Sequence, residues 1–251
     1  LMTMSEKMFT QDPSMPVRVI ASWCLGNVAV ALEAVSSCES LPSWAVSLFT
    51  KRLLPMCEAH EKFQVNGVRA VGSLYMLLGP ALRQRYGERV VRSLCACLSK
   101  ATAKTQWNAA YSLRSTLVDP LLGSLCVVAA RSLVDATRTA ENYKVRISAV
   151  TALRVLPSSE CLGEAFVELF CDLLDELCRP PRGPIRLERS RVRYASVLAK
   201  ELRTTIVFLG EHATVSHLGA LIPRLALLDP TTLYAKLDLD LFSQRTRAAV
   251  M

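Results

Sequence analysis

Three histidines, nine cysteines and a few clustered carboxylates are the residues of this chain whose types suit catalysis or metal binding. His212 and His217 are five residues apart, which leaves them off a shared helical face, and no cysteine or carboxylate stands at zinc-ligand spacing from them. Asp172, Asp175 and Glu176 fit an exposed helix surface better than an acid–base pair. The sequence therefore predicts no metal site and no bound cofactor.

The cysteines lack the spacing of a reactive site. Cys95 and Cys97 flank one residue rather than the two of a CxxC motif, and they fall inside a helical stretch, where neighbouring side chains diverge. Cys171 and Cys178 are two helical turns apart, which is typical of a buried stripe. No Gly-rich phosphate loop is found, and a nucleophile would need a histidine brought to it by the fold. We predict that the protein is not an enzyme.

The composition favours helices packed on helices. Half of the residues (51%) are hydrophobic but only 6% are aromatic, and 10 glycines are too few for an architecture built on many tight turns. The cysteines lie in apolar stretches and no signal peptide precedes them, so we expect a reducing compartment, the cytoplasm or nucleus. Because no run of about 18 apolar residues occurs, we expect no membrane span. The net charge of +8 favours an acidic partner.

An internal repeat organises the chain. Four segments share a pattern in which a polar anchor is followed by a small residue three positions on and by an apolar residue seven positions on. The anchors are Arg18, Gln64, Gln106 and Arg146. Their spacing falls within the period of HEAT and armadillo repeats, roughly 40 to 47 residues. We expect a fifth copy at Val192–Ala199, after an inserted loop.

Each repeat is expected to be a pair of helices, A and B, joined by a short turn. The B helices are predicted near 16–34, 62–78, 104–118, 143–156 and 190–209, and the A helices near 44–57, 87–99, 120–137 and 160–178. Small residues in the B helices would allow close approach to a neighbouring helix: Ala21, Gly67, Ala109 and Ala149. The prediction is a single all-α solenoid over 1–251, a right-handed HEAT/armadillo-like α-α superhelix of about five antiparallel helix pairs, with a weakly structured tail at 231–251.

Three of the B segments resemble a known family. The stretches at 17–27, 104–113 and 143–147, above all the Lys-Thr-Gln-Trp-Asn string at 104–108, are similar to consecutive B helices of the HEAT repeat-containing protein 6 family. The segment at 193–209 is similar to the helix that follows them. The resemblance implies an α-α superhelix with no known catalytic residues, and it supplies no site to carry over.

Two features depart from a regular array. Arg114 and Arg154 stand where the earlier repeats have Gly26 and Gly72, so the packing must differ there. The segment before the first B helix is too short and polar to cover it, and terminal repeats usually carry a polar cap. We therefore expect the chain to be the C-terminal part of a longer protein.

A basic segment at 179–193 begins with Arg-Pro-Pro and holds six arginines and one acidic residue in all. One reading is a solvated loop at 179–191 between two helices. The other is a site for phosphate, nucleic acid or an acidic peptide, because arginine binds such groups with two parallel hydrogen bonds. The candidate arginines are Arg179, Arg182, Arg186, Arg189 and Arg191. The sequence leaves both readings open.

The remaining candidate partner-binding residues lie on the B helices. Trp107 follows a polar anchor and is either partly exposed as an interface residue or fills a gap between layers, whereas Trp23 is expected in the core. The anchors form either a hydrogen-bonded ladder between repeats or a row of binding groups. Basic residues on the B helices would make one face positive: Arg69, Lys104, Arg114, Lys144, Arg146, Arg154, Lys200 and Arg203. We predict a protein-binding scaffold for an acidic or extended peptide, with nucleic acid as the alternative.

Overall fold

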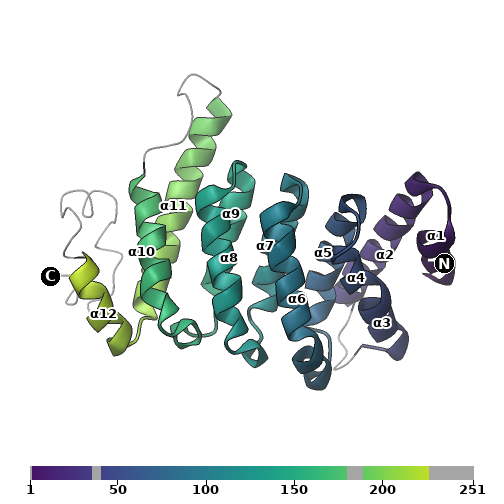
Figure 1. Cartoon of the computed structure of the whole chain (residues 1–251), viewed down its shortest axis with the longest axis horizontal. Helices are drawn as coiled ribbons and strands as arrows, with labels where there is room; N and C mark the ends of the chain where they lie inside the picture. Colours follow the sequence, from purple (N-terminus) through teal and green to yellow (C-terminus); the bar gives the residue numbers. More distant parts are fainter. Residues whose placement is uncertain (1, 36–40, 180–188, 226–251) are drawn as a thin grey trace. The chain divides into compact units, whose positions relative to one another are not determined.

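The computed structural model describes residues 2–35, 41–179 and 189–225 (Figure 1). Within these ranges the chain forms helices and turns and contains no strand. Its contacts divide it into two compact units, residues 1–129 and 130–251. The prediction of a single unbroken array over 1–251 stays a prediction, and the tail at 231–251 lies outside the described residues.

Unit 1 consists of helix pairs. The helices are α1 (Met2–Gln11), α2 (Met15–Val35), α3 (Ser43–Leu48), the π-helical turn η1 (Phe49–Leu53), α4 (Leu54–Cys57), α5 (Glu61–Tyr75), α6 (Pro80–Lys100) and α7 (Ala103–Thr116). The pairs are α1 with α2, α4 with α5, and α6 with α7. Helices α2, α5 and α7 also pack on one another in succession, so they form the B layer (Figure 1).

The repeat pattern places equivalent residues in the core of unit 1. Leu25, Val71 and Leu113 each lie seven residues after a polar anchor, and all three are fully buried. A fixed spacing of buried residues produces the apolar stripe of an amphipathic helix. The hydrophobic core therefore lies between the A and B layers.

Close approach of the helices depends on small residues. A Cβ atom added at Gly67 would lie 2.6 Å from Cβ of Met56 in the paired helix α4. A Cβ atom added at Gly72 would lie 2.4 Å from Oγ and 2.6 Å from Cβ of Ser112 in α7. Atoms at these distances overlap, so only glycine fits at either position. The prediction that small residues allow close packing is confirmed at Gly67.

Helix α2 is the most apolar helix of the B layer. It is long and apolar enough to cross a membrane by length and composition. In the structure it packs against α1 and α5 as the B helix of the first repeat. Core helices of repeat proteins pass the same test of length and composition.

The second half of the chain contains further pairs with tighter turns. The turn η2 (Pro120–Leu122) lies in unit 1, and α8 (Leu125–Thr139) runs across the boundary between the units. The helices that follow are α9 (Tyr143–Ala152), η3 (Leu153–Val155), η4 (Ser159–Leu162), α10 (Ala165–Cys178), α11 (Arg189–Glu211) and α12 (Val215–Leu225). Within unit 2, α11 packs on the B helix α9 and on the A helix α10.

The A helices predicted at 120–137 and 160–178 are each interrupted. A 3-10 turn comes first, and then Gly123 or Gly163 adopts a φ of 50° before the α-helix begins. This left-handed conformation is strained for residues with a Cβ, and it cannot continue a right-handed helix. The sequence prediction of one continuous helix is therefore wrong in both places.

The fifth repeat has a different register from the predicted one. Thr205 Oγ1 donates to the carbonyl of Val150 in α9 at 3.2 Å, as Ser112 Oγ donates to the carbonyl of Val68 at 2.9 Å. Ser112 is six residues after its anchor Gln106, so the anchor of the fifth repeat is Ala199, not Arg193. The prediction is wrong because Val192–Ala195 resembles the motif but lies six residues before the true position.

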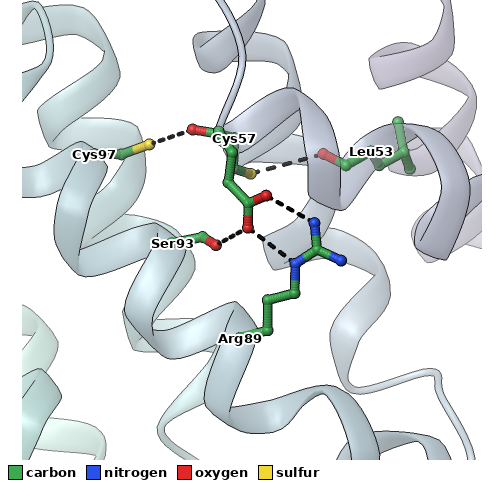
Figure 2. Close-up of polar contacts among 6 residues, drawn as sticks. Leu53, Cys57, Arg89, Ser93 and Cys97 are labelled. Carbon is green, nitrogen blue, oxygen red and sulfur yellow. Dashed lines mark hydrogen bonds and ion pairs between the residues drawn. The ribbon is translucent and has the colours of Figure 1, made fainter.

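A polar network ties the end of α4 to α6 (Figure 2). The carboxylate of Glu58 accepts two hydrogen bonds from Arg89, at 2.9 and 2.7 Å, and a third from Ser93 at 2.9 Å. Beside it, the thiol of Cys97 donates to the carbonyl of Cys57 at 3.2 Å. Burial raises the pKa of Cys97 to about 11 and that of Cys57 well above its usual range, so both thiols stay protonated and unreactive.

Gly72→Ala is expected to destabilise the protein by about 1–3 kcal/mol, because the added methyl group overlaps Ser112 and outweighs the better helix propensity of alanine. Urea unfolding measures the difference. Gly219→Ala in α12 is the matched control: no atom lies within 4 Å of its added Cβ, so we expect about 0.5–1 kcal/mol of added stability. Equal effects of the two substitutions would contradict the close packing of α5 on α7.

The Glu58 network should make stability depend on pH. Hydrogen bonds from Arg89 and Ser93 hold the pKa of Glu58 below its usual value, so its contribution is present above the unfolded pKa and is lost as pH falls through the lowered value. Since the pair is partly exposed, we expect Glu58→Gln to cost only about 0.5 kcal/mol at pH 7 and nothing near pH 2. Glu88→Gln controls for the change in net charge. A difference that persists at pH 2 would contradict this.

Candidate protein-binding surface

The B layer of unit 1 is held in register by hydrogen bonds between adjacent helices. Asn66 Nδ2 donates to Ser22 Oγ at 2.9 Å, which joins α5 to α2. Ser112 Oγ donates to the carbonyl of Val68, which joins α7 to α5. These bonds lie between buried groups, so each fixes how far one helix slides along the next. Residues at the same place in the repeat therefore lie at matching heights.

The position five residues after each anchor points out of the B layer. It holds Trp23 on α2, Arg69 on α5 and Tyr111 on α7. The side chains of Trp23 and Tyr111 are 53% and 60% exposed, and Arg69 is half-buried. Exposed large side chains mark an interaction site where several of them share one surface.

Three further exposed residues of α7 extend this surface. Trp107 is 38% exposed, one helical turn before Tyr111, in agreement with the first of the two placements predicted from its position beside the anchor. Lys104 and Arg114 are exposed at the two ends of the helix, which has no acidic residue. We call the six residues Trp23, Arg69, Lys104, Trp107, Tyr111 and Arg114 the unit-1 B face. The three charged residues that define this face, Arg69, Lys104 and Arg114, are all positive.

The prediction that Trp23 packs in the core is wrong. Ala21, Ser22 and Leu25 fill the buried side of α2, and the helical period of 3.6 residues then turns position 23 outward. Comparison with Tyr111 at the equivalent position was the sequence signal that could have placed Trp23 correctly.

Arg69 is positioned by α2. Its Nη2 donates to Asn27 Oδ1 at 2.6 Å, and the same nitrogen would lie 3.6 Å from a Cβ added at Gly26. The guanidinium group is therefore held against α2 by Asn27, in van der Waals range of position 26. Sequence reasoning named Arg69 only as one of several basic residues and missed this placement, because the contact joins residues 42 positions apart.

Two of the polar anchors bind the end of the preceding A helix. Arg18 Nε donates to the carbonyl of Phe9 at 2.9 Å, and Arg146 Nε donates to the carbonyl of Thr137 at 2.7 Å. The offset is nine residues in both cases. A helix leaves its last carbonyls without partners and carries negative charge at its C-terminus, so an arginine stabilises it.

Arg146 is also paired with a buried carboxylate and cannot be a partner-binding residue. It is only 5% exposed, and its Nη2 pairs with Oε1 of Glu176 in α10. The prediction that Arg146 contributes to a binding face is wrong, because the sequence does not show which side of α9 faces α8 and α10. This pair links one repeat to the next.

Glu176 belongs to a row of carboxylates on α10. Glu168 pairs with Arg131 at 3.1 Å and Asp172 pairs with Arg138 at 2.7 Å, both from α8. The row continues to the buried Glu176 at the next helical turn. The sequence predicted an exposed helix surface for Asp172, Asp175 and Glu176. This prediction is wrong for Glu176 and incomplete for Asp172, because both carboxylates pair with arginines of the neighbouring repeat.

The other predicted binding residues are distributed among different environments. Lys144 is exposed on α9, whereas Arg154 pairs with Glu201 of α11 and Arg179 pairs with Glu176 at 3.2 Å. Arg182 and Arg186 lie outside the described residues. For Arg189 and Arg191 only the backbone, in α11, is described. Of the predicted residues, Trp107 and Arg114 are thus both exposed on α7 in unit 1.

Other sites offer little chemistry. Within the described ranges no three His, Cys, Asp or Glu side chains come together as metal ligands would. A pocket of about 570 Å³ lies between α10 and α12, lined in part by Glu164, His217 and Arg224. His217 is buried, stacks on Phe166 at 4.3 Å between ring centroids, and has its Nε2 3.1 Å from the carbonyl of Gly163. It acts as a packing residue.

Similar solved structures cover nearly the whole chain. No family model matches the sequence. A structural-genomics crystal structure of an engineered protein matches with a TM-score of 0.60 and 13% sequence identity, over 99% of this chain and 96% of that chain. A designed armadillo repeat protein matches with a TM-score of 0.52 and 13% identity, over 100% and 98% of the two chains. Identities this low show the fold alone.

The chain is therefore an all-α solenoid with an armadillo-like repeat fold. The fold class predicted from the repeat is confirmed. Folds of this class generally serve as protein-binding scaffolds that expose a surface built from successive repeats.

Arg146→Met and Lys144→Met distinguish a structural residue from a surface residue on one helix. Because Arg146→Met leaves the carboxylate of Glu176 buried without its main partner, we expect a loss of about 3 kcal/mol in the free energy of unfolding. Lys144 is exposed, so Lys144→Met should change stability by less than about 0.5 kcal/mol. Chemical denaturation followed by circular dichroism measures both, and a small effect of Arg146→Met would contradict the buried pair.

Proposed function

We propose that the protein is a non-catalytic scaffold that binds another protein, an acidic or extended peptide segment, on the unit-1 B face. The observation that carries the proposal is that exposed Trp23, Trp107 and Tyr111 lie with cations on the outward side of stacked B helices. Tryptophan, tyrosine and arginine dominate binding energy at protein interfaces. The armadillo-like fold supports such a role in general terms.

The charges of this face favour an acidic partner. Lys104 and Arg114 are exposed on α7 without a nearby carboxylate on the same helix, and the chain carries a net charge of +8. Opposite charges steer association and disfavour wrong partners. An extended segment suits the face because the face is a series of parallel helices rather than a closed pocket.

The proposal is tested by selecting peptides from a displayed random library on the folded chain. Peptides enriched on the wild type should be rich in acidic and apolar residues, and a Trp107→Ala variant should bind them about tenfold more weakly. Glu88→Gln, on the surface of the A helix α6, should bind as the wild type does. The proposal is wrong if no peptide is enriched, or if the enriched peptides bind the Trp107→Ala variant equally well.

Nucleic acid is a second candidate partner, favoured by one feature of α11. The other B helices begin three residues before their anchors, whereas α11 begins ten residues before Ala199, so it extends past its neighbours in unit 2 (Figure 1). Arg193 and Tyr194 are exposed on this extension. Phosphate binding there should weaken steeply as salt rises, and salt-independent binding of an oligonucleotide would rule it out.

Two finer assignments remain proposals. The resemblance of the segments at 17–27, 104–113 and 143–147 to the HEAT repeat-containing protein 6 family supports a place in that family. A location in the cytoplasm or nucleus is supported by the placement of cysteines such as Cys57 and Cys97 in the buried core of helical stretches, as is usual for small core residues in a reducing compartment.

A further inference from the structure

We infer that the unit-1 B face recognises an extended peptide in which two apolar side chains flank a central carboxylate, each three residues away from it. This inference rests on the proposed function and specifies the ligand of the same surface. Its basis is the row formed by Trp23, Arg69 and Tyr111, which we call the +5 row because each residue follows its anchor by five positions.

The +5 row has a defined order. Trp23 lies on α2, Arg69 on α5 and Tyr111 on α7, and these helices pack on one another in that sequence. The buried hydrogen bonds from Asn66 to Ser22 and from Ser112 to Val68 fix the sliding of each helix against the next. The row therefore presents an aromatic ring, a cation and an aromatic ring at matching heights.

The spacing of the row matches that of an extended chain. Packed helices lie about 8–10 Å apart, and an extended peptide in the polyproline II conformation advances about 3.1 Å per residue with three residues per turn, so side chains three residues apart lie on the same side. Moving from one helix to the next thus takes about three residues of peptide. A side chain that meets Trp23 and one that meets Tyr111 are about six residues apart, with a residue facing Arg69 midway.

The chemistry of the central position favours a carboxylate. Arg69 is held across α2 by its hydrogen bond to Asn27, which leaves the rest of its planar guanidinium for a ligand. A carboxylate accepts two parallel bonds from one guanidinium group, and the fixed orientation of Arg69 lowers the entropy lost on binding.

The two outer positions favour apolar side chains. Trp23 and Tyr111 each offer a large, rigid surface that loses little conformational entropy on binding. Stacked bases of single-stranded nucleic acid would need aromatic rings close to one another, whereas these rings are two helix spacings apart. The face therefore fits a peptide better than an oligonucleotide.

The test uses a labelled twelve-residue peptide with leucine at positions 3 and 9, glutamate at position 6 and serine elsewhere. Fluorescence anisotropy with the full chain should show saturable binding. Replacing the glutamate with glutamine, or moving it to position 4, should weaken binding at least about tenfold. Trp23→Ala, Tyr111→Ala and Arg69→Gln should each have a similar effect on the original peptide.

Controls separate binding from folding. Tyr194→Ala removes an equally aromatic exposed residue from unit 2 and should leave binding unchanged. Because Trp23 and Tyr111 are exposed, their variants should keep the unfolding temperature of the wild type. Arg69→Lys keeps the charge without the paired hydrogen bonds, so it should weaken binding while the helix content stays the same.

The outcomes distinguish this inference from the proposed function. The inference is overturned if the affinity for the peptide is unchanged by the three substitutions, or if it does not depend on the position of the glutamate. Failure of this peptide while other library peptides depend on Trp107 overturns the inference alone and leaves the proposed function intact. If no peptide binds and a single-stranded oligonucleotide does, both are overturned.

Discussion

The close packing of adjacent B helices is the constraint on which the rest of unit 1 depends. Gly72 leaves no room for a methyl group against Ser112, and Gly67 leaves none against Met56. Once the backbones approach this closely, serine and asparagine side chains reach across to the next helix. Small residues thus fix both the distance between helices and their register, and side chains on the outer side inherit a regular arrangement.

Arginines divide into two functional groups according to their contacts. Arg18 and Arg146 bind the carbonyls at the ends of A helices, and Arg146 is further neutralised by Glu176. Arg114 is exposed on a helix without acidic residues. A large part of the chain's positive charge therefore stabilises the stack of repeats, and only the remainder is available to a partner. Net charge by itself overstates the strength of a basic surface.

The +5 row shows how a repeat protein gains a binding surface without a pocket. Each helix contributes one side chain, and the spacing between helices sets the spacing of the ligand's contacts. Since such a surface needs no special loop or catalytic motif, substitutions at outward positions change its specificity without disturbing the core. Arg69 illustrates this, because its orientation depends on a hydrogen bond to Asn27 of the preceding helix.

The repeat period, the alternation of A and B helices and the buried residues seven positions after each anchor were predictable from the sequence, because local periodicity directly reflects which side of a helix is buried. The positive φ at Gly123 and Gly163 was not predictable from this pattern. The register of α11 was not predictable either, because the string at 192–195 resembles the motif and only the contact of Thr205 with Val150 identifies the true position. Trp107 takes the exposed one of its two predicted placements, but Trp23 and Arg146 were assigned to the wrong environments. Contacts between residues 30 or more positions apart determine the placement of Arg146 and Arg69, and only the tertiary structure brings such residues together.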